Sequence, residues 1–288
     1  MIERRILAKL LDVEELPTLP EVMNQILETV ADEDSSAQDV TELLERDHAI
    51  SARVLRMANS AFYGLRHTVD SIRRAVVVIG FDAVRQLALA TAVFDTLASR
   101  KQFALDPDDF WMHSLGTAKA VQVLCKKHCK VDSPEGSFTA GLLHDIGKYV
   151  LALVLKEEYV AIVQEAQATE RPLRDIELER LETSHEEVGQ WVANRWGLPT
   201  RLSEALGNLY RAGTYTGVAE EEVRVVALGD HISRIAEFGV AGDWAPPSLD
   251  PPLLAAMDIK RATISEIAEE LAGFRDDTRQ FLEALGRP

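Results

Sequence analysis

Apolar residues recur at the spacing of an α-helix along almost the whole chain, and this period restricts the fold more than any other feature. In residues 21–30, for example, Val22, Ile26 and Val30 share one helical face. The same period runs through further segments, which are residues 38–47, 50–62, 82–98, 184–197 and 221–239. Because almost every periodic segment has the helical spacing, we predict an all-α fold.

Residues 75–79, with the sequence AVVVI, are the one segment whose composition favours a strand. Valine and isoleucine favour β structure because their branched side chains fit a pleated surface. The segment is short, however, and helical periods flank it on both sides. We therefore predict a short buried helix over residues 71–80, ending at Gly80.

A polar interval at residues 98–109 is the best internal boundary. It ends in a strong helix start, because Asp106 is a favourable N-cap and Pro107 fits the first helical position. The acidic residues that follow suit the positive end of the helix dipole. We therefore predict an N-terminal helical part at residues 1–105 and a second helical part at residues 106–288.

The net charge of the chain is -16, from 47 acidic and 31 basic residues. A general nucleic-acid binder gains its affinity from basic patches that release counterions. We therefore expect no direct binding to nucleic acid, and an acidic surface that serves mainly for solubility.

Three features predict a soluble cytoplasmic protein with no membrane-spanning segment. Cys125 and Cys129, the only cysteines, lie four residues apart on one predicted helix and do not form the disulfide framework of a secreted protein. Residues 1–16 are amphipathic and charged, unlike a signal peptide. The longest strongly apolar stretches, residues 75–81 and 149–155, are far shorter than a bilayer span.

The segment GLLHDIGKYVL, residues 141–151, sets His144 beside Asp145 between two glycines in an apolar run. Imidazole nitrogen and carboxylate oxygen are the ligands that borderline divalent metals prefer. Gly141 and Gly147 leave room for another helix to approach closely. The pair therefore indicates either a metal site or a buried polar network left from an ancestral enzyme.

This segment resembles the core of the HD superfamily of metal-dependent phosphohydrolases, and most of the chain resembles its HD-related output-domain (HDOD) branch. The blocks LPTLPEVMNQILETV, DVTELLERDHAISARVLRMANSAFYG and SIRRAVVVIGFDAVRQLAL resemble the N-terminal half of that branch. The blocks FWMHSLGTA, GLLHDIGKYVL and SHEEVGQWVANRWGLP resemble its second half. The resemblance implies a multi-helical HD-domain-like bundle with an N-terminal helical subdomain.

The resemblance also implies a set of metal ligands. They are His113 from WMHSL, His144 and Asp145 from the HD pair, and Asp230 from ALGDHIS. Two imidazoles and two carboxylates would leave positions for water or phosphate on one divalent transition metal ion. Iron, manganese, zinc and nickel are not distinguished by these ligands.

A second metal is not expected. His185 lies where related two-metal phosphodiesterases carry a further histidine, but those enzymes also need a His-His pair in the next helix. The corresponding stretch here, EALGNLYRAG, contains no histidine, and the GYP signature of cyclic-di-GMP phosphodiesterases is absent as well.

Three further roles follow if chemistry occurs at the site. Lys148 would neutralise charge that develops on a phosphate, and His185 would act as an acid or base. Asp109, one helical turn before His113, would orient that imidazole.

The resemblance implies a regulatory module of bacterial signal transduction that binds one metal and acts through a protein partner or a nucleotide. The alternative is a metal-dependent phosphohydrolase acting on a nucleotide or another phosphate ester. A third hypothesis is a structural interaction domain with an empty site. Since helices account for the whole chain, we expect the input signal to come from a separate protein or from a directly bound ligand.

Several other polar residues have simpler interpretations. His231 is expected at the surface or beside a ligand, and His48 and His67 are not expected to bind metal. Cys125, His128 and Cys129 share a helical face, but a structural zinc site needs a fourth ligand. Arg53, Arg56 and Asn59 could line a groove for a partner or nucleotide, but they are more simply a basic helix face. Trp111, Trp191 and Trp196 are expected in the core.

Overall fold

The computed structural model describes residues 2–12, 19, 21–31, 36–60, 63–98, 104–129, 131, 132, 134–245 and 250–284. These residues are helices joined by turns and loops, with no strand among them. The prediction of an all-α fold is therefore confirmed. They form two compact units, which are Met1–Leu16 with Arg100–Gly273, and Pro17–Ser99 with Phe274–Pro288.

The smaller unit is built around one long helix. Its helices are α2 (Glu21–Ala31), α3 (Ala37–Arg46), α4 (His48–Ala58), α5 (Ile72–Ile79), α6 (Phe81–Ala98) and α17 (Arg275–Ala284). The helices α2 to α5 all contact α6, and α17 packs on α4. Local capping sets the helix ends, as at Ser36, whose side chain accepts a hydrogen bond from the Asp39 amide while its own amide donates to the Asp39 carboxylate.

The segment AVVVI is helical as predicted, because it forms most of α5. Ser71 caps this helix and Gly80 ends it with φ +91, a conformation that favours glycine. The prediction that this helix is buried is wrong. Val77 and Val78 are 84% and 48% exposed, because apolar residues in consecutive positions lie around the whole helix and only one face packs within the unit.

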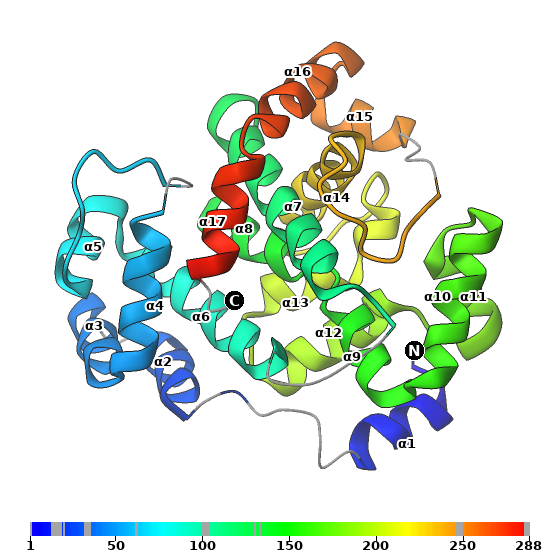
Figure 1. Ribbon diagram of the computed structural model, residues 1–288, viewed down its shortest axis with the longest axis horizontal. Coiled ribbons are helices and arrows are strands. Elements are labelled where there is room, and N and C mark those ends of the chain that lie inside the picture. The colour runs from blue at the N-terminus through cyan, green and yellow to red at the C-terminus, as the bar shows by residue number, and fades with distance from the viewer. Residues whose placement is uncertain are drawn as a thin grey trace. The chain divides into compact units, whose positions relative to one another are not determined.

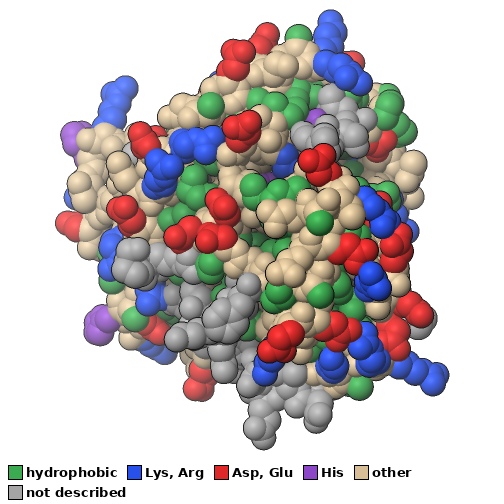
Figure 2. Space-filling view, turned by 45° about the vertical axis from the view of Figure 1, so that its right-hand side comes forward, with side chains coloured by type: hydrophobic (Ala, Val, Ile, Leu, Met, Phe, Trp, Pro, Cys, Tyr) green, Lys and Arg blue, Asp and Glu red, His purple; other side chains and the backbone are tan. Residues whose placement is uncertain are grey.

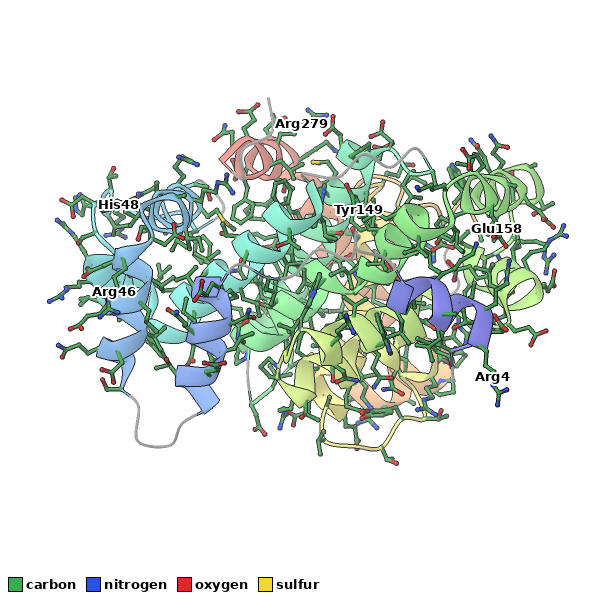
Figure 3. All side chains as sticks on the ribbon, turned by 90° about the horizontal axis from the view of Figure 1, so that it is seen from below. Arg4, Arg46, His48, Tyr149, Glu158 and Arg279 are labelled. Carbon is green, nitrogen blue, oxygen red and sulfur yellow. The ribbon has the colours of Figure 1, made fainter. Side chains whose placement is uncertain are left out.

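The larger unit holds the remaining helices. They are α1 (Arg4–Asp12), α7 (Pro107–Lys127), α8 (Pro134–Leu143), α9 (Ile146–Leu155), α10 (Glu157–Thr169), α11 (Leu173–Leu181), α12 (His185–Arg195), α13 (Thr200–Gly207), the 3-10 turn η1 (Leu209–Arg211), α14 (Glu220–Ile235), α15 (Pro251–Met257) and α16 (Arg261–Ala272). Helix α7 runs beside α8 and α14, and α9 packs on α12 (Figure 1). Tyr149 of α9 lies in the core, with its ring centroid 5.6 Å from that of Phe110 and 6.4 Å from that of Trp111 (Figure 3).

At each end of the chain, the terminal segment belongs to a different unit from the segment next to it in the sequence. The chain changes unit at residue 100, six residues before the predicted start of the second part at residue 106, but α1 belongs to the larger unit and α17 to the smaller one. Arg5 and Lys9 fix α1 to α10 through ion pairs of 2.9 and 3.2 Å with Glu158. No local sequence pattern indicates these two crossings, because they depend on contacts between residues far apart in the chain.

By length and composition alone, the apolar stretch Gly136–Leu155 could cross a bilayer. This corrects the expectation that every apolar stretch is far too short, because α8 and α9 follow each other with only a turn between them. Most of the stretch, 89%, is buried inside the protein, which is typical of core helices. At the surface, acidic side chains are interspersed with basic ones on the face in Figure 2.

Candidate metal centre

The four predicted ligands converge in the larger unit from distant parts of the sequence. His113 lies in the second turn of α7, His144 and Asp145 form the turn between α8 and α9, and Asp230 lies in the second half of α14. One ligand atom from each of His113, His144 and Asp230 lies within 4.8 Å of the other two. His113 Nε2 is 2.9 Å from Asp230 Oδ1, and His144 Nε2 is 3.7 Å from the same oxygen.

Asp145 lies beside this group of three. Its Oδ2 atom is 3.3 Å from His144 Nε2 and 3.8 Å from His113 Nε2. The same oxygen is 2.8 Å from Lys148 Nζ. The contacts bring all four predicted ligands together, while their joint binding of one ion stays a prediction.

The turn between α8 and α9 explains how two adjacent residues can face one site. Within a helix their side chains would point about 100° apart. Here α8 ends at Leu143 and α9 begins at Ile146, so His144 and Asp145 lie between two helices. Gly147 then allows α9 to meet the start of α12, because a Cβ atom at this position would lie 1.8 Å from the carbonyl oxygen of His185. The expected close approach of another helix is therefore found.

The imidazole of His144 has a defined orientation. Its Nδ1 atom lies 2.8 Å from the carbonyl oxygen of Gly141, which can only accept, so Nδ1 carries the proton and donates. Nε2 then faces Asp230 and Asp145 and becomes a metal ligand once its own proton is lost. A backbone carbonyl commonly fixes a metal-binding histidine in this way, so the donor set fits a divalent metal ion.

The prediction that Asp109 orients His113 is wrong. Asp109 is exposed in the first turn of α7, and within the described part of the chain its carboxylate forms no hydrogen bond to His113. Partial loss of hydration, together with the nearby carboxylates of Asp106 and Asp108, raises the pKa of Asp109. Ser233 lies closest to the other ring nitrogen instead, with Oγ 3.5 Å from His113 Nδ1.

Opposite charges dominate the electrostatics of the centre. Burial alone would lower the pKa of His144, but the carboxylates of Asp145 and Asp230 raise it to about 10. Burial also opposes ionisation of both carboxyls. His144 and Lys148 nevertheless hold the pKa of Asp145 well below its usual range. His113 and His144 do the same for the pKa of Asp230. Both carboxylates are therefore charged and ready to bind a cation.

Lys148 is buried and already paired. Its Nζ atom lies 2.8 Å from Asp145 Oδ2 and 2.7 Å from Asp243 Oδ2. Burial disfavours the charged amine, but these two carboxylates outweigh burial and raise the pKa of Lys148. Asp243 also accepts a hydrogen bond of 3.0 Å from the Leu173 amide, which ties its loop to the start of α11. The role of Lys148 toward a phosphate stays a prediction.

His185 is the end of a buried hydrogen-bonded chain. Its Nδ1 atom lies 2.6 Å from Glu177 Oε2, and its amide donates to the same oxygen at 2.9 Å. The Tyr159 hydroxyl donates to Glu177 Oε1 at 2.6 Å. His185 Nε2 then lies 3.8 Å from Asp145 Oδ1. Burial lowers the pKa of His185, but the Glu177 carboxylate reverses this and raises it.

Sequence reasoning missed three residues of this site. Glu177 and Tyr159 carry no motif, and LRDIELERL reads as a charged surface helix although Glu177 is fully buried. Asp243 lies in a loop without a recognisable pattern. The one available signal was the spacing of Glu177 eight residues before His185, across a short turn between helices.

A cavity of about 670 Å³ opens onto the centre. It is lined by His144, Asp145, Lys148, Pro172, Arg174, His185, Glu186, Leu209, Tyr210, Arg211, Ala212, Thr214, Ala227, Asp230, His231, Arg234, Asp243, Ala245, Asp250, Pro251, Pro252 and Leu253. This volume is typical of a small-molecule site. Three of the four candidate metal ligands, His144, Asp145 and Asp230, therefore face a space that can hold a ligand.

Comparison with known proteins decides the family. The HDOD domain family matches residues 16–211 of the chain. The chain belongs to the HDOD domain family. Its resemblance to that family, seen in the sequence blocks, is thus confirmed.

Solved HDOD-like structures share the fold over nearly the whole chain. An HDOD domain protein of unknown function from Geobacter sulfurreducens is 24% identical and has a TM-score of 0.79, with 96% of each chain covered. A candidate phosphohydrolase from Shewanella amazonensis is 28% identical and has a TM-score of 0.74, with 97% of this chain and 98% of that chain covered.

Curated relatives are longer proteins. An uncharacterized protein of Treponema pallidum is 25% identical over 193 residues, which are 65% of this chain and 36% of the relative. The uncharacterized protein YuxH of Bacillus subtilis is 26% identical over 151 residues, which are 52% of this chain and 34% of that relative. This HDOD chain thus spans about a third of the length of the curated relatives it matches.

The other histidines of this HDOD protein have separate places. His231 is buried beside Asp230 and lines the cavity, and burial lowers its pKa. His48 and His67 belong to the smaller unit, where both are exposed, and Figure 3 marks His48. His128 is exposed at the end of α7 near the thiols of Cys125 and Cys129, and among the described residues this group does not form a metal-binding cluster.

Asn59 has a structural role in this HDOD protein. Its side-chain amide donates to the carbonyls of Leu55 at 2.8 Å and Val69 at 2.7 Å, and its oxygen accepts from the Val69 amide at 2.7 Å. These bonds tie the loop after α4 to the helix. Among the tryptophans, Trp111 and Trp196 are buried as predicted, whereas Trp191 is half-buried beside Arg195.

Proposed function

We propose that this HDOD protein is a regulatory module of bacterial signal transduction that binds one divalent transition metal ion. His113, His144, Asp145 and Asp230 would hold the ion. The module would act in the cytoplasm through a separate signalling protein or a nucleotide bound in the cavity. The observation that carries the proposal is the convergence of three ligand atoms within 4.8 Å at a cavity.

The surroundings of Asp145 favour one ion over two. In a two-metal site, a bridging carboxylate binds a metal through each oxygen. Here Asp145 Oδ2, the oxygen that faces His144 and His113, is also 2.8 Å from the ammonium of Lys148, and this positive charge beside the centre disfavours a second cation. The segment EALGNLYRAG, at residues 204–213, also contributes no histidine.

Titration of metal into chelator-treated protein tests this proposal. We expect saturation at one equivalent and a rise in melting temperature, because an ion that binds only the folded chain adds about 2.7 kcal/mol of stability at a hundredfold excess over Kd. Asp230→Asn should weaken binding, whereas His67→Ala, at an exposed histidine of the smaller unit, should not. Saturation at two equivalents, or no saturable binding, would refute the proposal.

The second candidate function is a metal-dependent phosphohydrolase. The Glu177–His185 pair favours it, since Glu177 holds the proton on Nδ1 and leaves His185 Nε2 free to take or give a proton near Asp145. The 28% identical Shewanella relative, a candidate phosphohydrolase, also supports it. When bound, a divalent metal would polarise a phosphoryl oxygen and acidify a water.

Phosphate release from a panel of phosphate esters separates the two candidates. If the protein is a regulatory module, metal should cause no more phosphate release by the natural protein than by His144→Ala. The phosphohydrolase predicts release that needs metal and falls by about a hundredfold or more in His185→Gln, because general acid-base catalysis typically contributes this much.

A further inference from the structure

The cavity above the metal centre also has an arginine-rich wall. Arg174 comes from α11, Arg211 from η1 and Arg234 from α14, and all three line the cavity. None of them is needed to hold a metal ion. Their positive charges therefore bear on which ligand the cavity binds.

Arg211 and Arg234 donate hydrogen bonds to neutral oxygens. Arg211 Nε donates to Asn208 Oδ1 at 2.8 Å, and Nη2 donates to the same neutral oxygen. Arg234 Nη2 donates to the backbone carbonyl of Ala245. Within the described part of the chain, neither guanidinium forms an ion pair with Asp or Glu.

These hydrogen bonds to neutral oxygens orient the two guanidinium groups without neutralising their positive charge. Asn208 is itself held in place, because its amide donates to the Glu204 carbonyl at 2.7 Å. Arg211, an exposed residue, is thereby oriented and keeps its positive charge. Such a preorganised planar fork is the geometry that binds a phosphate through two hydrogen bonds.

Arg174 closes the same wall but is already paired. Its Nε atom donates to Glu186 Oε2 at 2.8 Å, and its guanidinium lies 3.7 Å above the ring of Tyr210. Other acidic residues that line the cavity are paired too, as Asp243 is with Lys148. Two carboxylates near this wall could oppose an anion, which are Asp250, an exposed residue, and Asp243, whose charge interacts with that of Arg234.

We infer that Arg211 and Arg234 form an anion-binding subsite that takes a second phosphate group of the ligand. The ligand class would be an organic bisphosphate, with one phosphoryl group at the metal centre and the other at the arginines. The volume of about 670 Å³ suits a ligand of this size. The position of the first group rests on the proposed function, but the arginine subsite itself needs no metal.

Equilibrium dialysis with radiolabelled inorganic phosphate tests the subsite on the full chain. Chelator-treated protein should bind one phosphate, and zinc-loaded protein freed of excess metal should bind two. Arg211→Gln and Arg234→Gln should each weaken the metal-independent phosphate by about tenfold or more, since a hydrogen bond to a charged group is lost. Arg180→Gln is the matched control, because Arg180 lies on α11 in an exposed pair with Glu165.

Arg211→Lys covers the case in which Arg211→Gln does not fold. It keeps the charge but loses the fork, so it should weaken the same phosphate less than Arg211→Gln or Arg234→Gln does. Absence of phosphate binding in the metal-free protein, or binding that both arginine variants leave unchanged, would overturn the inference. Arginine-dependent binding in a protein that takes up no metal would instead refute the proposed function and leave the subsite standing.

Discussion

At the scale of single residues, the centre depends on buried carboxylates that set the state of their partners. Glu177 is fully buried and accepts from Tyr159 and from two nitrogens of His185. It therefore fixes both the rotation and the tautomer of that imidazole. Asp243 accepts a hydrogen bond of 2.7 Å from Lys148 Nζ and so holds that ammonium in place.

Glu177→Gln should lower the pKa of His185. The carboxylate now outweighs the effect of burial and raises that pKa, so a neutral amide of the same shape would remove the largest effect that opposes burial. The measurement is an NMR titration of the His185 ring protons in the metal-free protein. Glu179→Gln, in an exposed pair with Arg171 on the same helix, should leave the titration unchanged, and an unchanged His185 in Glu177→Gln would contradict this account.

Metal affinity should rise with pH. In the metal-free protein the pKa of His144 is about 10, so its imidazole is protonated at neutral pH and must lose that proton to bind an ion. Below this pKa, each rise of one pH unit should strengthen binding by about tenfold for the one proton released. Competition with a chelator of known affinity between pH 6 and 9 measures the slope, and a flat profile would mean that His144 is not a ligand.

At the scale of elements, the packing of α9 on α12 brings His185 to the HD pair. Gly147 makes this possible, since a Cβ atom there would meet the His185 carbonyl at 1.8 Å. Gly189 lies on α12 in the same contact, but it has room for a side chain. A Cβ atom there would lie 3.4 Å from the Ile146 side chain, which is an ordinary van der Waals distance. The two glycines thus offer a matched pair.

Gly147→Ala should destabilise the protein by about 3 kcal/mol or more, because overpacking at a backbone contact forces the helices apart. Gly189→Ala should be neutral or stabilising by up to about 1 kcal/mol, since alanine favours a helix. Urea unfolding of both variants measures this difference. Equal stabilities would contradict the close contact of α9 and α12.

The helices themselves could be predicted from local patterns, whereas their burial could not. The start of α7 follows from Asp106 and Pro107, and AVVVI was correctly predicted as helical. Val77 is nevertheless 84% exposed, because the composition of a short apolar helix does not tell which face packs. Glu177 shows the opposite failure, since a charged sequence conceals one buried carboxylate.

At the scale of the whole molecule, the candidate centre is assembled from α7, the α8–α9 turn and α14. The sequence separates His113 from Asp230 by more than a hundred residues, and no spacing rule predicts that they meet. The HDOD resemblance indicated this convergence, and the structure brings Nε2 of His113 within 2.9 Å of Asp230. The arginine wall was not foreseen, because its three arginines come from separate elements and form no motif.

The central claim is that this assembly holds one metal ion. The most direct test is elemental mass spectrometry of untagged protein from metal-replete medium, compared with His144→Ala. The account predicts one equivalent of a divalent transition metal in the natural protein and its loss in the variant. Protein without metal, or an equal metal content in His144→Ala, would contradict the account and leave the HD pair as a buried polar network.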